Sequence, residues 1–128
     1  MKILHETDTI IFAQEENEVT ALATMAMIAS TTALYAREEL FMFIQRTASA
    51  IQAGCHAILY ERASREAVVN VPVGYLLYGY FSRPVASIFA NRLRPLAKED
   101  YRSGKQLWLI DIVAPFGHSK ELMAAVDQ

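Results

Sequence analysis

The sequence predicts an α+β fold in which helices pack on a small, mostly antiparallel sheet. Two segments with helical spacing of apolar residues come first. Strand-like segments rich in β-branched and aromatic residues follow, separated by polar turns, and two short helical segments flank the last strand. A length of 128 residues, 53% of them hydrophobic, suits one core. We therefore expect a single domain over residues 1–128.

The N-terminal half is expected to be an arm followed by two helices. Residues 1–16 are polar and acidic around a short apolar run, which predicts an extended arm. Asn17 is a typical N-cap, and the helix after it, through about Ser30, has an apolar face made of Val19, Leu22, Met25 or Ala26, and Ala29. A second helix begins near Arg37, ends at Gly54 and is expected to bury Leu40, Phe43, Ile44, Thr47 and Ile51.

The C-terminal half is expected to supply the strands. Residues 56–61 and 71–81 predict two strands around a polar turn, and the second is apolar on both faces, as a central strand would be. Ser82 and Pro84 open a short helix through about Arg92. A loop over 95–104 leads to a strand at 107–113, and Ser119 caps a last helix over 120–126.

Charge is distributed unevenly, although the net charge is only −2. Residues 1–39 carry seven acidic and two basic side chains, whereas 83–105 carry six basic and two acidic ones. The basic segment is either a docking surface for an acidic partner or a solvated surface with internal ion pairs.

Composition also bears on compartment and cofactors. No apolar run approaches the roughly 18–20 residues of a membrane helix, and the N-terminus lacks the apolar core of a signal peptide. We expect a cytoplasmic protein without a membrane span or a nucleic-acid partner. Cys55 is expected to be a small buried apolar residue rather than a nucleophile. The spacing of His5, His56 and His118 does not match a zinc site, so no metal is expected.

The most informative residue is Asp111, in the middle of the apolar run 107–113. The run predicts a buried strand, where an unpaired carboxylate costs several kcal/mol. Asp111 is therefore either a structural carboxylate that caps a turn or pairs with a nearby arginine, or a functional group.

Four segments resemble one family, the RTX toxin-activating lysine acyltransferases. They are Pro72-Val73-Gly74-Tyr75, Ser82, the Leu96–Gly104 loop with its E-D-Y-R-S-G sequence, and the W-L-I-D-I-V-A-P-F-G run at 108–117. They occur in the family's order and spacing, without gaps from about Leu22. The resemblance implies a fold similar to the GCN5-related N-acetyltransferases. It implies transfer of a fatty acyl group from acyl carrier protein to a lysine of a protoxin, with no bound cofactor.

The resemblance also implies site residues. Asp111 is the expected catalytic carboxylate, and Tyr35 stands where the family has its catalytic histidine. Tyrosine, with a pKa of about 10, is a poor base but a competent acid for a leaving thiolate. Substrate is expected to bind at Thr32, where the family usually has a serine, and at Gly117 and His118 after the strand. The alternative for His118 is a solvent-exposed residue without a role. The expected carrier-protein docking residues are Arg92, Arg94, Lys98, Arg102 and Lys105.

Two departures from the family open alternatives. The chain ends eleven residues after Gly117, whereas family members continue further, and a second subunit covering an open sheet edge predicts a homodimer. Loss of the histidine leaves a noncatalytic binding or regulatory relative as the rival hypothesis. A coenzyme A-dependent small-molecule acetyltransferase is disfavoured, because the turn at 114–118 lacks a G-x-G phosphate cradle.

Overall fold

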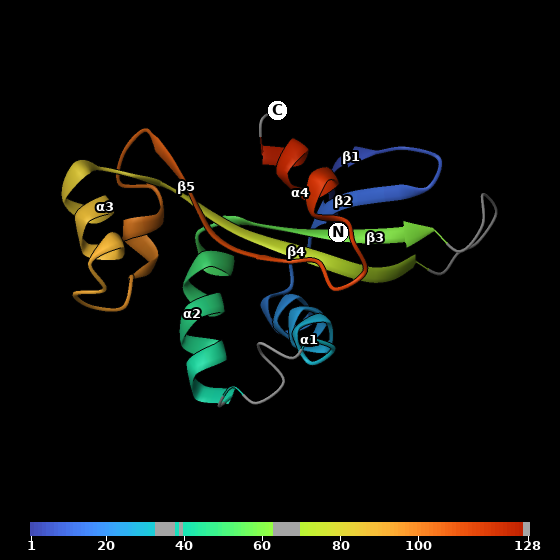
Figure 1. The fold of residues 1–128 in the computed structure, drawn as a ribbon, viewed down its shortest axis with the longest axis horizontal. Coiled ribbons are helices and arrows are strands. Elements are labelled where there is room, and N and C mark those ends of the chain that lie inside the picture. The colour runs from blue at the N-terminus through green and yellow to red at the C-terminus, as the bar shows by residue number, and fades with distance from the viewer. Residues whose placement is uncertain (33–37, 39, 63–69, 127–128) are drawn as a thin grey trace.

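The computed structural model describes residues 1–32, 38, 40–62 and 70–126 (Figure 1). Five strands form one sheet in the order β1-β2-β3-β4-β5, and each neighbouring pair is antiparallel. Their bounds are Lys2–Glu6, Ile10–Gln14, His56–Arg62, Asn70–Phe81 and Gln106–Val113. The 12-residue β4 pairs along both edges, which confirms the predicted central strand.

Residues 1–16 provide the hairpin β1–β2 rather than only an extended arm. β2 pairs with β3, and its central residues Ile11, Phe12 and Ala13 are buried, whereas every residue of β1 is exposed. The sequence shows the extended conformation but not this pairing, because the partner strand begins more than 40 residues later.

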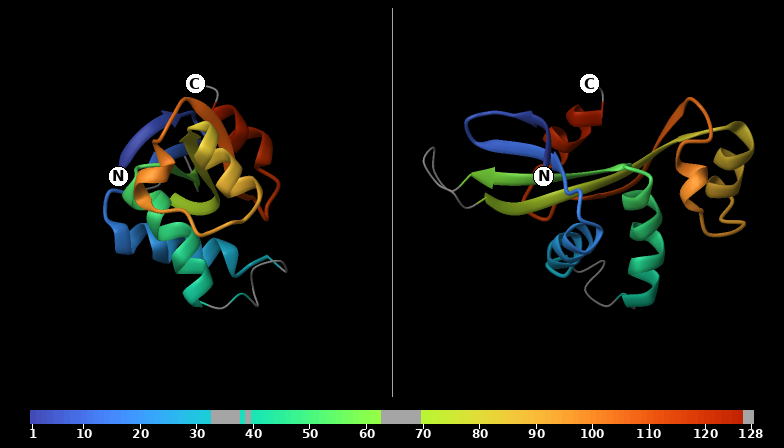
Figure 2. Two further views of the ribbon diagram at one scale, coloured as in Figure 1. Left: turned by 90° about the vertical axis from the view of Figure 1, so that its left-hand side faces the viewer. Right: turned by 180° about the vertical axis from the view of Figure 1, so that it is seen from behind.

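Helices cover both faces of the sheet. The helices α1 (Glu18–Ala29) and α2 (Leu40–Gln52) lie on one face, and α4 (Ser119–Val126) lies on the other (Figure 1 and Figure 2). The short α3 (Arg83–Ala90) and a 3₁₀ turn, η1 (Lys98–Tyr101), lie at the end of the long β4–β5 ribbon. The larger core lies between α1, α2 and the sheet, and includes Met25, Phe43, Tyr75 and Leu77. A smaller cluster around Leu76 and Leu122 lies under α4.

The predicted helix ends at Asn17, Ser82 and Gly54 agree with the observed capping, whereas Ser119, predicted as a cap, is the first residue of α4. The side chain of Asn17 accepts a hydrogen bond from Thr20 N at 2.9 Å. Ser82 accepts one from Val85 N at 3.4 Å. Gly54 follows α2 with φ of +71°, which glycine adopts without strain.

Three predicted core positions are wrong: Val19 is 74% exposed, Leu40 67% and Ile44 40%. Val19 lies in the first turn of α1, and the first turns of α2 point away from the sheet (Figure 1). Apolar residues at the free end of a helix have no layer to pack on, so helical spacing alone overestimated the buried face. Phe43, Thr47 and Ile51 are buried as expected.

The α+β prediction is confirmed, and the architecture is consistent with the GCN5-related N-acetyltransferase-like class. Among the described residues, none of the helices has the length and apolar character needed to span a bilayer.

Candidate active site

A β-bulge in β5 aims the Asp111 side chain. Leu77 of β4 lies opposite Asp111 and Tyr78 lies opposite Leu109, so Ile110 is an extra residue in β5. Trp108 packs against Phe81 and Phe89 on the side of the larger core, and strict alternation from it would place Asp111 on the other face. Because of the bulge, Asp111 faces α2, whereas Ile112 joins the cluster under α4.

Arg46 of α2 is the observed ion-pair partner of Asp111. Arg46 Nε lies 3.3 Å from Asp111 Oδ2, and Nη1 of the same guanidinium donates a hydrogen bond of 2.5 Å to Glu38 Oε1. Only 8% of the Asp111 side chain is exposed, compared with 17% for Glu38 and 27% for Arg46. One guanidinium therefore contacts two carboxylates that are mostly shielded from solvent.

The position of Arg46 is fixed by its neighbours. Its guanidinium carbon lies 5.6 Å from the centre of the Phe43 ring, and its carbonyl oxygen accepts a 3.4 Å hydrogen bond from the Tyr101 hydroxyl. Tyr101 belongs to the E-D-Y-R-S-G loop. Burial tends to lower the pKa of Arg46, but the hydrogen bond to Glu38 and the charge of Asp111 outweigh it, so the pKa is raised. The loop motif thus supports α2 at the residue that meets Asp111.

β5 is not the buried strand that the sequence predicted. In the described part of the chain it pairs only with β4, and Leu107 and Leu109 are 40% and 38% exposed. An apolar run marks a strand but does not distinguish a central strand from an edge strand with one covered face. Asp111 is shielded even so, because its face is covered by α2.

The E-D-Y-R-S-G loop closes on the end of β4. Gly104 N donates to Tyr80 O at 3.0 Å, and Ser82 N donates to the Ser103 hydroxyl at 3.0 Å. A Cβ on Gly104 would lie 2.4 Å from Ser82 N and 2.5 Å from Phe81 O, so only glycine fits without a backbone shift. The family-like motif is therefore explained in part by packing.

The remaining predicted site residues are distributed over the molecule. Tyr35 lies outside the described residues. Thr32 follows α1, and its hydroxyl donates to Ala29 O at 3.0 Å. Gly117 has φ of +90°, and His118 leads into α4, on the face of the sheet opposite α2 (Figure 2). His118 Nε2 lies 3.5 Å from Glu61 Oε2, so its observed contact is with β3 and not with Asp111.

The five predicted docking residues fall into two groups. Arg94 pairs with Asp100 at 2.7 Å, and Arg102 donates from Nε to Ala53 O at 2.7 Å, at the C-terminal end of α2. Both therefore have structural roles. All five are exposed, so Arg94 and Arg102 are accessible to a partner as well as Arg92, Lys98 and Lys105.

Two other side chains that can take part in chemistry, those of Cys55 and His56, are buried. Cys55 is fully buried, as expected, and burial raises the pKa of its thiol. His56 is 2% exposed, its Nε2 accepts a hydrogen bond from Glu15 N at 3.1 Å, and burial lowers its pKa to about 4. Within the described segments, no three His, Cys, Asp or Glu side chains are grouped as a metal site would require.

Arg46 and Glu38 were not predicted from the sequence as site residues. A signal was present: Arg46 lies three residues after buried Phe43 and four before buried Ala50, which puts it on the core-facing side of α2. An arginine at such a position needs a carboxylate partner.

The α+β fold, with helices packed on a five-stranded antiparallel sheet, is consistent with an acyltransferase-like protein. The model of the RTX toxin acyltransferase family matches residues 11–128, and the chain belongs to that family.

Individual relatives agree with this assignment. The lysine-acyltransferase RtxC of Vibrio cholerae is 20% identical over 123 residues, which is 96% of this chain and 74% of RtxC. The leukotoxin-activating lysine-acyltransferase LktC of a Pasteurella haemolytica-like species is 34% identical over 59 residues, 46% of this chain and 36% of LktC. The corresponding protein of Mannheimia haemolytica serotype A1 is 32% identical over 53 residues, 41% of this chain and 32% of its own length.

Proposed function

We propose that this protein is a lysine acyltransferase that moves a fatty acyl group from acyl carrier protein to a lysine of an RTX-type toxin in the cytoplasm. The observation that carries the proposal is the shielded Asp111 carboxylate, aimed by a bulge, in a chain that belongs to an acyltransferase family. The donor arrives as a thioester substrate, and no bound cofactor is needed.

The reaction requires two proton movements. The lysine ammonium must lose a proton before its nitrogen attacks the thioester carbonyl, the new C–N bond forms as the C–S bond breaks, and the departing thiolate takes up a proton. We assign Asp111 to accept the proton or to orient the amine, and Tyr35 to donate to the thiolate. Thr32, Gly117 and His118 stay candidates for substrate contacts.

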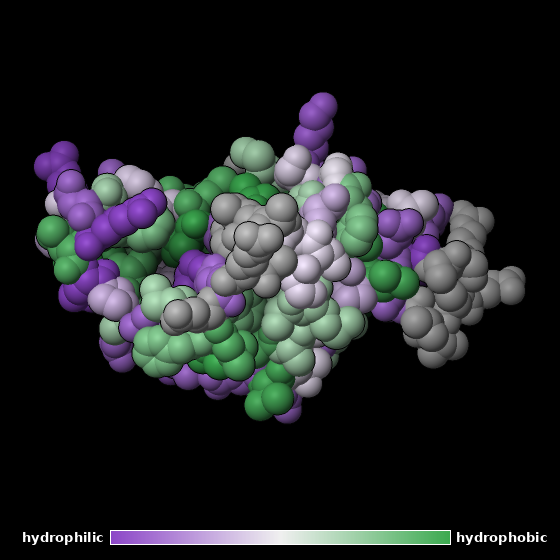
Figure 3. Space-filling model, turned by 60° about the horizontal axis from the view of Figure 1, so that its bottom comes forward, coloured by the Kyte–Doolittle hydropathy of each residue, from purple (hydrophilic) through white to green (hydrophobic). Residues whose placement is uncertain are grey.

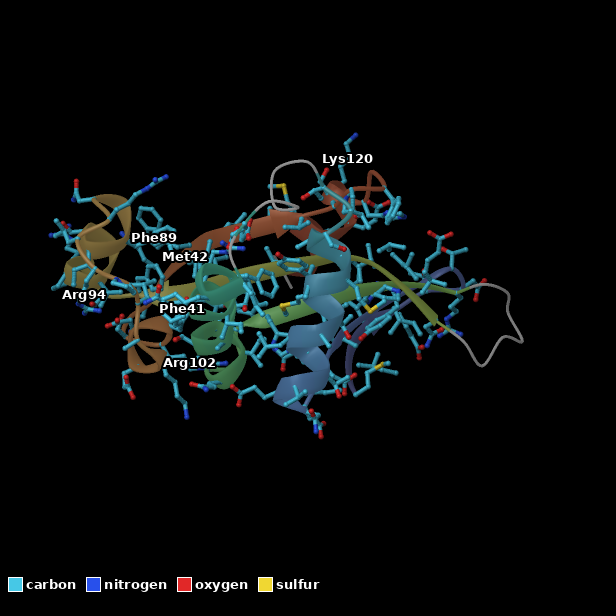
Figure 4. All side chains as sticks on the ribbon, turned by 90° about the horizontal axis from the view of Figure 1, so that it is seen from below. Phe41, Met42, Phe89, Arg94, Arg102 and Lys120 are labelled. Carbon is cyan, nitrogen blue, oxygen red and sulfur yellow. The ribbon has the colours of Figure 1, made fainter. Side chains whose placement is uncertain are left out.

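An apolar surface beside the basic segment supports a fatty acyl donor. Leu40, Phe41 and Met42 of α2 are 67%, 70% and 51% exposed. Figure 4 shows Phe41 and Met42 on the side of α2 turned toward α3, where Phe89 and Arg94 lie, whereas Arg102 contacts the other end of α2 through Ala53. In Figure 3 hydrophobic patches lie on this face, and hydrophilic residues gather toward the end that carries α3. Apolar side chains suit a hydrocarbon chain, and the adjoining cations suit an acidic carrier protein.

The test is incubation with acyl-loaded carrier protein and a panel of lysine-containing polypeptides, read by mass spectrometry. The proposal expects the acyl mass on a polypeptide and an equal loss from the carrier. Asp111→Asn keeps the shape of the side chain and should abolish both changes. Glu16→Gln is a matched control, because it replaces a carboxylate with an amide at an exposed position outside the proposed site. Transfer by Asp111→Asn at the parent rate contradicts the assignment.

The Arg46–Asp111 pair also gives specific support to a second candidate, a noncatalytic binding relative. In that case the pair is only structural, and Tyr35 marks a lost site. Tyr35→His discriminates between the candidates. If the protein is an enzyme that uses Tyr35, the substitution changes its transfer rate. If it is a noncatalytic relative, no transfer occurs with either tyrosine or histidine at this position.

We further propose a homodimer that covers the outer edge of β5. Leu107 and Leu109 are exposed on a face of β5 beside this edge, and β5 has one strand partner in the described part of the chain. Light scattering over a range of concentrations tests this proposal. A dimer that is lost in Leu109→Lys supports it, and a monomer at high concentration rejects it.

A further inference from the structure

The guanidinium of Arg46 provides the charge that the Asp111 carboxylate requires in its shielded position. Burying an ionised carboxylate without a partner is costly, and an opposite charge within about 4 Å favours the ionised form. The Nε–Oδ2 distance is 3.3 Å, and the Asp111 side chain is only 8% exposed. Solvent therefore screens this pair less than a surface pair.

Glu38 and Asp111 both contact the guanidinium of Arg46. Its Oε1 accepts from Nη1 at 2.5 Å, so the guanidinium is bound to Glu38 at one edge and meets Asp111 through Nε. The two carboxylates compete for one cation. Removing Glu38 releases the edge of the guanidinium that it binds, whereas removing the charge of Arg46 takes this cation away from Asp111.

We propose that Arg46 is a positioning residue of the acyl-transfer site, which holds Asp111 ionised and facing α2. This inference rests on the proposed function for its role in the reaction, but the effect of Arg46 on Asp111 can be measured without any reaction. Arg46 would set the pH range over which Asp111 is an anion, and so the pH range in which it accepts a proton or orients an ammonium group.

The reaction-independent test is a carboxyl-carbon NMR titration of Asp111 in the intact chain. In Arg46→Gln the midpoint of the titration should rise by about 1 pH unit or more relative to the parent. Arg46→Lys keeps a positive charge and should stay near the parent midpoint. Glu38→Gln is the opposite-sign control, for which the midpoint should stay or fall. An unchanged midpoint in Arg46→Gln, or a rise in Glu38→Gln, overturns the proposal.

A measurement on the parent covers the case in which Arg46→Gln does not fold. The Arg46 Nε resonance should move with the same midpoint as the Asp111 carboxyl carbon, because the two atoms form one ion pair. An Nε resonance that does not respond to the Asp111 titration overturns the proposal.

The role in the reaction is read from the pH profile of kcat/KM for acyl transfer. The acidic limb should move to higher pH in Arg46→Gln by the same amount as the NMR midpoint, and should not do so in Glu38→Gln. A merely structural role lowers the rate at every pH without moving the limb, and that result overturns the positioning role. If the parent transfers no acyl group, the proposed function fails, while the NMR titration still decides whether Arg46 controls Asp111.

Discussion

The Asp111 carboxylate of β5 lies 3.3 Å from the guanidinium Nε of Arg46 on α2, which joins the edge strand of the sheet to the helix layer above it. Two features produce the contact. The bulge at Ile110 turns Asp111 toward α2, and the spacing from Phe43 turns Arg46 toward the sheet. The contact identifies a partner for a carboxylate that the sequence left with two alternative roles.

Loss of Arg46 should destabilise the fold. Arg46→Ala leaves two shielded carboxylates without this cation, and we expect the free energy of unfolding to fall by about 1–3 kcal/mol, less than for a fully buried pair because Arg46 is 27% exposed. Gln45→Ala is the matched control, since Gln45 is exposed on the same helix, and should change stability by about 0.5 kcal/mol or less. Urea denaturation measures both. Equal effects of the two substitutions would count against a stabilising pair.

His56 should make stability depend on pH. Burial lowers its folded-state pKa from 6.5 to about 4, so between these values the unfolded state binds more protons than the folded state. Stability from this group is present above pH 6.5 and is lost as pH falls toward 4, by about 3 kcal/mol in all. Denaturation of the parent and of His56→Gln at several pH values measures the effect. The variant should lose this slope, whereas His5→Gln, at an exposed position, should keep it.

Gly104 and Gly117 should respond differently to alanine. In Gly104→Ala the new Cβ meets backbone atoms of Phe81 and Ser82, which predicts a loss of about 2–3 kcal/mol. In Gly117→Ala the Cβ meets nothing within 4 Å, and only the φ of +90° is unfavourable, which predicts about 1 kcal/mol. Thermal unfolding of both variants gives the order. A larger loss for Gly117→Ala would contradict the packing assigned to the E-D-Y-R-S-G loop.

Substitutions in the basic segment 83–105 should distinguish residues that bind the carrier protein from residues that stabilise the fold. Lys98→Glu and Lys105→Glu should weaken binding of acyl carrier protein and reduce its dependence on salt, without loss of stability. Arg102→Ala should lower stability because it removes the hydrogen bond to Ala53 O. Lys120→Glu on α4 is the charge-matched control, away from this surface in Figure 4. Binding that is insensitive to salt and to both lysines would exclude this surface.

Local signals in the sequence predicted most of the elements. Asn17, Gly54 and Ser82 mark helix ends through short-range backbone requirements, and the apolar character of 71–81 identified the central strand. The pairing of β2 with β3, the edge position of β5 and the exposure of Leu40 depend on contacts between distant segments, which periodicity does not contain.

Of the two residues in the observed ion pair, only Asp111 was predicted from the sequence. Asp111 was conspicuous as a charge in an apolar strand, and the family resemblance gave it a role. Arg46 lies 65 positions earlier, in a helix of mixed apolar and polar residues, and its pairing depends on a bulge that no local sequence pattern indicated. Tyr35 stays a prediction from the family motif.

The proposed role of Asp111 in acyl transfer to lysine is tested most directly by mass spectrometry of a lysine-containing RTX-type polypeptide after incubation with acyl-loaded carrier protein. We expect an acyl adduct on lysine with the parent protein and none with Asp111→Asn, at equal folded concentration. An adduct formed equally by both proteins, or by neither, would contradict it.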